Sequence, residues 1–179
     1  KLIYARMYDY IEKNNILSNK QFGFRKNHST SHALVSLTES IKKQLDDRKR
    51  VAGVFIDLEK AFDTVNHKIL CDKLSYYGFR GKINNLINSF LTDRTQYVSI
   101  NGYDSCKLPI NCGVPQGSTL GPLLFLLYIN DLKFCLKTAT ASHFADDTCL
   151  TYAATKIKNL ESNLNYDLKN LSEWLRANK

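Results

Sequence analysis

Three aspartates stand where a strand is predicted to end or a hairpin to turn. Asp57 lies in the last part of the apolar run Val51–Leu58, and Asp146 and Asp147 stand between the two apolar arms of Ser142–Tyr152. Two adjacent acidic residues are more typical of a hairpin turn than of a strand interior. If the two strands are neighbours in one sheet, we expect the three carboxylates to converge.

Converging carboxylates repel one another and favour bound cations. Each like-charged pair at ~4 Å costs about 1 kcal/mol in water and about 4 kcal/mol at an effective dielectric of 20. Oxygen ligands favour magnesium or manganese over zinc. Two such ions held ~4 Å apart can activate an attacking hydroxyl and stabilise a leaving oxygen in phosphoryl transfer. The alternative is that each acid only caps or builds a turn.

Other catalytic arrangements fit the sequence less well. Gly117–Gly121 reads GSTLG rather than G-x-S-x-G, which disfavours a hydrolase built on Ser118 and His67. The loop Gly113–Gly117 lacks the G-K-[ST] ending of a phosphate-binding P-loop. In a response-regulator receiver the acidic pair precedes the strand-end aspartate, whereas here it follows.

The five cysteines form no C-x-x-C pair, which indicates reduced thiols and predicts an intracellular protein. A zinc site drawn from Cys106, Cys112 and His143 matches no standard ligand spacing. The longest apolar run, Leu123–Ile129, is shorter than the ~20 residues of a membrane span, so no membrane association is expected. The chain starts at Lys1 inside a helical pattern, from which we expect a piece of a longer protein.

The composition is that of a globular protein with a basic surface. The 179 residues are 44% hydrophobic and 23% charged, with eight glycines and three prolines, which disfavours disordered and collagenous classes. Twenty-five Lys and Arg against seventeen Asp and Glu give a net charge of +8. This charge favours a polyanionic partner, and the alternative is a surface kept basic for solubility.

Helices are predicted where apolar residues recur every three or four positions: 2–13, 66–77, 82–91, 119–136 and about 157–175. A further helix should begin near Ser29–Ser31 and bury an apolar stripe from Leu34 to Leu45. Before it, Gln21–Thr30 is typical of an exposed basic loop with aromatic residues.

The strands are predicted from short apolar runs. Val51–Leu58 is nearly continuous and β-branched, which is typical of a central strand covered on both faces. Residues 96–100 and 106–111 should form a hairpin around an Asn-Gly turn, with Pro109 at an edge or a bulge. Because strands and helices are interleaved, we expect an α/β fold with helices packed on a mixed sheet.

Three ordered blocks resemble reverse transcriptases: FIDLEKAFD (Phe55–Asp63), GVPQGSTLGP (Gly113–Pro122) and FADD (Phe144–Asp147). QFGFR (Gln21–Arg25) and YINDL (Tyr128–Leu132) are similar to enzymes of non-LTR retrotransposons, and the likeness covers nearly the whole chain. The resemblance implies one right-hand polymerase domain with a mainly antiparallel palm sheet packed against helices. Residues 1–50 would be fingers and 51–179 palm with an interleaved fingers segment, and the rest of the palm and the thumb would be missing.

The resemblance also implies catalytic roles. Asp57 and Asp146 would be the principal catalytic metal ligands, with Asp147 completing the acidic cluster and the backbone carbonyl of Leu58 assisting one ion. The cofactor would be two magnesium ions, which manganese could replace. Phe62 resembles the aromatic gate that rejects a ribose 2′-hydroxyl, and the alternative is a phenylalanine of the core.

Further positions match segments that bind nucleotide or nucleic acid in the family. Gln116 would contact the incoming nucleotide, and Arg25 with Lys26 would hold its triphosphate. The alternatives are a loop glutamine and solvated surface charges. Phe144, which stands where tyrosine is commonest, and Gly117 would contact primer and template.

The implied function is that of an RNA-directed DNA polymerase, a nucleotidyltransferase acting in retrotransposition in the cytoplasm and nucleus. Its partners would be an RNA template, a DNA primer and deoxynucleoside triphosphates, and its parent polyprotein would supply a thumb and an upstream endonuclease. Basic residues at 25–28, 48–50 and 156–158 are candidates to line the nucleic acid. The alternatives are a non-catalytic remnant that keeps the fold and RNA binding, and a template-free nucleotidyl cyclase of palm type.

Overall fold

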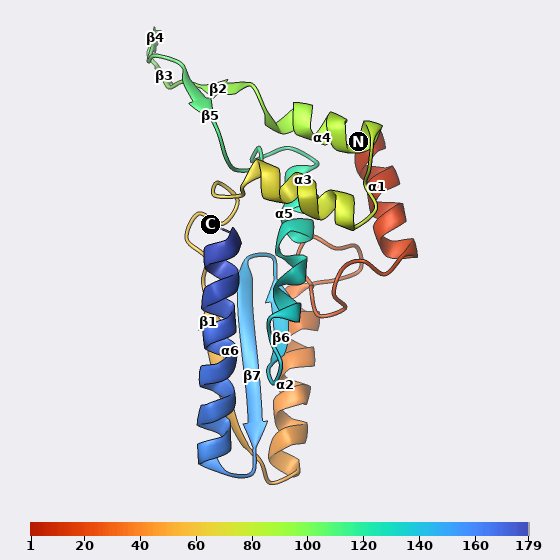
Figure 1. Cartoon of the computed structure of the whole chain (residues 1–179), viewed down its shortest axis with the longest axis vertical. Coiled ribbons are helices and arrows are strands. Elements are labelled where there is room, and N and C mark those ends of the chain that lie inside the picture. Colours follow the sequence, from red (N-terminus) through yellow and green to blue (C-terminus); the bar gives the residue numbers. More distant parts are fainter. Residues whose placement is uncertain (179) are drawn as a thin grey trace.

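A three-stranded antiparallel sheet lies between helices in the lower half of the molecule as drawn (Figure 1). The computed structural model describes residues 1–178. The strand order is β1 (Arg50–Ile56), β7 (Asp147–Ala154) and β6 (Thr140–Phe144), and both pairings are antiparallel. The predicted α/β fold with a mainly antiparallel sheet packed against helices is confirmed.

The helices lie close to their predicted positions: α1 (Leu2–Lys13), α2 (Thr30–Asp46), α3 (His67–Tyr76), α4 (Lys82–Leu91), α5 (Gly121–Ile129) and α6 (Ile157–Asn178). Of the three candidate caps of α2, Ser29 is the one used, because its side chain accepts a hydrogen bond from the His32 N–H. The helix predicted over 119–136 is α-helical to Ile129 and continues as a 3₁₀ helix, η1 (Asn130–Phe134). No helix within residues 1–178 is long and apolar enough to span a membrane.

One face of the sheet is buried under α5 and α6. Leu150 and Tyr152 point to this face from β7 and belong to the same core as α5 and α6. α5 is buried around its whole circumference, which explains its almost unbroken apolar sequence from Leu123 to Ile129. The fully buried Asp167 of α6 accepts backbone hydrogen bonds from residues 137–139. These bonds fix the segment that leads into β6.

The opposite face of the sheet is open, so the expectation of a β1 covered on both faces is wrong. Phe55 points to this face and is 79% exposed. α2 flanks the sheet beside β6 and buries none of its side chains, and Leu34 and Leu45 of its predicted buried stripe are exposed (Figure 1). An antiparallel sheet tolerates one solvated face, and an apolar run alone does not reveal which kind of sheet contains it.

The segment between α4 and α5 forms a projecting arm (Figure 1). β2 (Arg94–Gln96) pairs with β5 (Leu108–Ile110), and β3 (Ser99–Ile100) pairs with β4 (Tyr103–Asp104), so the predicted hairpin consists of two short ladders. Its tip is the predicted Asn-Gly turn, in which both residues have positive φ. The predicted edge position of Pro109 is confirmed, because β5 belongs to a sheet of two strands.

Candidate active site

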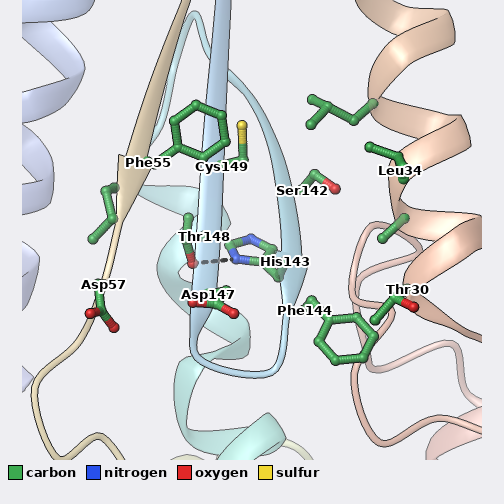
Figure 2. A pocket seen from close by; sticks show the side chains of 13 residues that line it. Thr30, Leu34, Phe55, Asp57, Ser142, His143, Phe144, Asp147, Thr148 and Cys149 are labelled. Atoms are coloured by element: carbon green, nitrogen blue, oxygen red, sulfur yellow. Dashed lines mark hydrogen bonds between the residues drawn. The ribbon is translucent and has the colours of Figure 1, made fainter.

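The sheet brings Asp57 and Asp147 to one place. β1 ends at Ile56, which pairs with Thr148, so the next residues in the register are Asp57 and Asp147. Opposite residues on neighbouring strands share a face of the sheet, and here it is the open face. Both aspartates are exposed and line the same end of one cavity (Figure 2).

Asp146 lies at the tip of the hairpin. Phe144 pairs with Asp147, so Ala145 and Asp146 form a two-residue turn, close to the turn predicted from the sequence. The Asp146 side chain is half-buried and does not line the cavity of the other two acids. Within residues 1–178, no group of three or more His, Cys, Asp or Glu side chains is arranged to hold a metal ion.

The pair Asp57–Asp147 fits a magnesium ion better than it fits zinc. Both donors are carboxylate oxygens, and both are open to solvent. Magnesium keeps several waters and binds through one or two protein carboxylates together with substrate phosphates, so a cage of three acids is not required. Carboxylates at the adjoining ends of two neighbouring strands repel each other, and a divalent cation would relieve that repulsion.

The cavity runs from this acidic end along the open face, between the sheet and α2. It has a volume of about 410 Å³, a floor that includes Phe55 and Cys149, and a wall formed by Leu34 and Leu37 of α2. Phe144 lines it as well and lies beside Thr30 (Figure 2). Phe55 was missed as a site residue, although Phe55 and Asp57 share one face of an alternating strand.

Phe62 lies in an aromatic stack rather than alone. Its ring stacks on the buried Phe125 with centroids 4.3 Å apart, and the exposed Phe24 meets it edge-on at 6.0 Å. Phe62 itself is half-buried and packs against the core. It is therefore held by the core while one side remains accessible. This position is compatible with both interpretations made from the sequence, an aromatic gate and a phenylalanine of the core. Phe24 was not singled out, because its place beside Phe62 depends on tertiary contacts.

The GVPQG loop docks on the segment that follows Asp57. Gly113 donates its N–H to the Val65 carbonyl and Val114 donates to the Phe62 carbonyl, both at 2.8 Å. Gly113 has φ +87°, and a Cβ there would lie 2.8 Å from the Asp63 carbonyl oxygen. Only glycine combines this left-handed backbone with so close an approach.

Gln116 and Gly117 lie at the exposed end of that loop. The Gln116 amide donates a hydrogen bond to the Asp63 carboxylate at 2.8 Å, and both groups line a second cavity of about 540 Å³. Gly117 has φ +77° and open space where a Cβ would be. The partner Asp63 was not foreseen, since a contact between residues 53 positions apart has no local signal.

Arg25 and Lys26 are not among the residues that line the Asp57–Asp147 cavity. The Arg25 guanidinium forms an ion pair with both carboxylate oxygens of Glu12, at 2.9 and 3.0 Å, and donates to the Ser18 carbonyl. The Lys26 ammonium lies 5.0 Å from the centre of the Tyr8 ring. In this structure Arg25 ties its loop to α1, and the triphosphate contact predicted for it stays a prediction.

His143 supports the acidic hairpin from its buried side. It is 5% exposed, and its Nδ1 lies 2.9 Å from the hydroxyl of Thr148, the residue after Asp147. Burial and, to a smaller extent, the positive charge of Lys133 lower the pKa of His143 to about 4. The imidazole is therefore neutral near pH 7.

The sequence of residues 1–179 matches the family described as reverse transcriptase (RNA-dependent DNA polymerase). The chain belongs to this family. It is 33% identical over 190 residues to the probable RNA-directed DNA polymerase from transposon BS of Drosophila melanogaster, a match that covers 98% of the chain and 20% of that protein. It is 30% identical over 181 residues to the RNA-directed DNA polymerase from mobile element jockey of the same species, covering 97% and 20%.

This reverse transcriptase chain thus spans about a fifth of the length of those relatives. Its fold is similar to that of telomerase from Candida tropicalis, with a TM-score of 0.63 at 14% identity over 92% of the chain and 35% of the telomerase. Telomerase from Candida albicans gives a TM-score of 0.64 at 11% identity, covering 94% and 32%. The family resemblance found in the sequence is confirmed, and at these identities the two structures support the fold alone.

We expect the free energy of unfolding to fall as pH decreases from about 6.5 to 4. In this range the unfolded chain binds a proton at His143 that the folded chain does not bind, so acid favours unfolding. His143→Gln should remove one proton from this linkage and flatten the slope by about 1.4 kcal/mol per pH unit. Urea denaturation at several pH values measures both slopes. The exposed His32→Gln is the control, and equal slopes for wild type and His143→Gln would contradict the assignment.

Proposed function

We propose that this chain is the part of an RNA-directed DNA polymerase that transfers deoxynucleotides to a primer 3′-hydroxyl on an RNA template, in retrotransposition. The observation that carries the proposal is the placement of Asp57 and Asp147 opposite each other on the open face of a reverse transcriptase sheet. The names of the Drosophila relatives, both RNA-directed DNA polymerases of mobile elements, support the same activity.

The reaction breaks a phosphoanhydride bond of the nucleotide and forms a phosphodiester bond to the primer. The primer 3′-oxygen forms a bond to the α-phosphorus, the bond from that phosphorus to the bridging oxygen breaks, and pyrophosphate leaves while the hydroxyl proton passes to solvent. Asp57 and Asp147, together with Asp146 and the Leu58 carbonyl, would hold two magnesium or manganese ions. When bound, such ions stabilise the charge that develops on the attacking and leaving oxygens.

The surrounding residues would position the substrates. Phe62, fixed against Phe125, would lie under the sugar and leave no room for a 2′-hydroxyl. Gln116 would turn its amide from Asp63 to the incoming nucleotide, and Phe144 would contact the primer or template from the cavity wall. Gly117 leaves the backbone open to a close approach by a strand.

The net charge of +8 supports a nucleic-acid partner. Arg50, which begins β1, pairs with Ala154 near the start of α6, so the basic segments 48–50 and 156–158 lie at the end of the sheet opposite to the aspartates. Contacts of these residues with phosphates would make affinity fall steeply with salt. The structure of the Candida albicans telomerase, which has a similar fold, contains a fragment of telomeric RNA. This accords with an RNA-binding role here.

A second candidate function is a non-catalytic remnant that keeps the fold and binds RNA. The observation that favours it is the engagement of Arg25, the cation expected to hold the triphosphate, in its ion pair with Glu12. Primer extension that depends on the aspartates would favour the polymerase over the remnant. If that extension also requires a template, it excludes a nucleotidyl cyclase.

We expect Asp57→Asn and Asp147→Asn each to lower template-directed primer extension by about a hundredfold or more, because each removes half of the carboxylate pair. Incorporation of labelled deoxynucleotide with Mg²⁺ or Mn²⁺ measures it. The assay should use both the 179-residue chain and the protein with its natural flanking sequence. Glu59→Gln, an exposed neighbour, is the control. Full activity in both aspartate variants would refute the proposed site.

We expect Phe62→Val to reduce discrimination against ribonucleotides. The smaller side chain opens space where the phenyl ring lies against Phe125, so the ratio of kcat/KM for a deoxynucleotide to that for its ribonucleotide should fall by about tenfold or more. Single-nucleotide incorporation kinetics measure this ratio. An unchanged ratio at retained activity would show that Phe62 serves the core only.

A further inference from the structure

The side chain of Gln21 is buried against the tip of the acidic hairpin. Gln21 is 3% exposed, and its Nε2 donates to the Ala145 carbonyl at 3.2 Å. Its Oε1 accepts from the Ala145 N–H at 3.0 Å and from the Gly23 N–H at 2.8 Å. One side chain thus satisfies both backbone polar groups of Ala145, which immediately precedes Asp146 and Asp147.

Ala145 needs this support because of its backbone conformation. Its φ is +58°, in the left-handed region that alanine rarely adopts, whereas two-residue hairpin turns place Gly, Asn or Asp at such positions. Alanine has no polar side chain that could stabilise the turn locally. The hydrogen bonds from Gln21 supply from a distant segment what the turn residue itself lacks.

The backbone around Gln21 fixes it to the hairpin. Phe22 donates its N–H to the His143 carbonyl at 2.9 Å, and His143 donates to the Lys20 carbonyl at 2.8 Å, so this segment runs parallel to β6 at the sheet edge. A Cβ on Gly23 would overlap the backbone nitrogen of Ala145. Gln21, Phe22 and Gly23 are all buried, so the expectation of an exposed loop over Gln21–Thr30 is wrong for its first three residues.

We propose that Gln21 is a positioning residue that holds Ala145 in its left-handed conformation within the Ala145–Asp146 turn and thereby sets where the carboxylates of Asp146 and Asp147 lie. The catalytic part of this inference rests on the proposed polymerase function. The contact also gives the N-terminal segment a direct role in the geometry of acids more than a hundred residues away along the chain.

Hydrogen exchange of single backbone amides tests the hold on the turn directly. In Gln21→Met, a side chain of similar length without hydrogen bonds, the amides of Ala145 and Gly23 lose their acceptor and should exchange about tenfold faster. The amides of Phe22 and His143 keep their backbone acceptors and should be unchanged, which reports that the fold persists. Unchanged exchange at Ala145 would overturn the proposal.

Steady-state extension kinetics test the consequence for catalysis. Gln21→Met should lower kcat by about tenfold or more and leave KM for the deoxynucleotide within about twofold, because the turn moves the acids and not the nucleotide contacts. The matched control is Gln44→Met on α2, where the glutamine side chain accepts a hydrogen bond from Lys49. Wild-type kcat in Gln21→Met, with Asp57→Asn inactive, would overturn the inference and leave the proposed function standing.

Two further outcomes are distinguishable. A wild-type protein without aspartate-dependent extension would refute the proposed function, whereas the exchange of Ala145 still decides whether Gln21 holds the turn. If Gln21→Met does not fold, Gln21→Asn carries both tests, since it keeps a polar group in the buried site but is too short to reach both partners. Normal exchange and kcat in folded Gln21→Asn would then overturn the proposal.

Discussion

The antiparallel register between β1 and β7 is the constraint on which the candidate site depends. Seven consecutive residue pairs, from Arg50–Ala154 to Ile56–Thr148, fix which residues face each other at the strand end. A shift of one residue would send the side chain of one aspartate to the buried face, among Leu150 and Tyr152. The buried apolar face therefore fixes the register, and the register brings Asp57 and Asp147 together. The buried face of these strands packs in the core, and their open face carries the two aspartates.

The difference between the two faces also explains where the site opens. α5 and α6 pack against one face, whereas α2 only flanks the other, so a cavity remains between α2 and the strand that carries Phe55. The loops that follow β1 and precede α5 are held to each other by backbone hydrogen bonds of Gly113 and Val114. Residues from distant blocks of the sequence are thus kept beside the acidic strand ends by main-chain contacts.

Much of this arrangement could be predicted from local sequence. The helix positions, the Asn-Gly turn and the placement of the aspartates at a strand end and a hairpin follow from periodicity and turn chemistry, and three ordered motifs identified the family. The open face of β1 could not be predicted, because an apolar run does not tell which helices cover it. The contacts of Gln21 and Asp63 could not be predicted either. The partners of both residues lie far along the chain, and nothing in the local sequence indicates these contacts. Arg25 illustrates the same limit: its charge is visible, but its ion pair with Glu12 depends on how the loop folds back on α1.

The central claim is that the Asp57–Asp147 strand ends hold a divalent cation, and paramagnetic broadening by Mn²⁺ tests it most directly. In amide NMR spectra of the 179-residue chain, substoichiometric Mn²⁺ should selectively broaden the signals of residues 57, 58 and 146–148. That broadening should disappear in the Asp57→Asn/Asp147→Asn double variant. Broadening that is uniform, centred elsewhere or unchanged in the double variant would contradict the account.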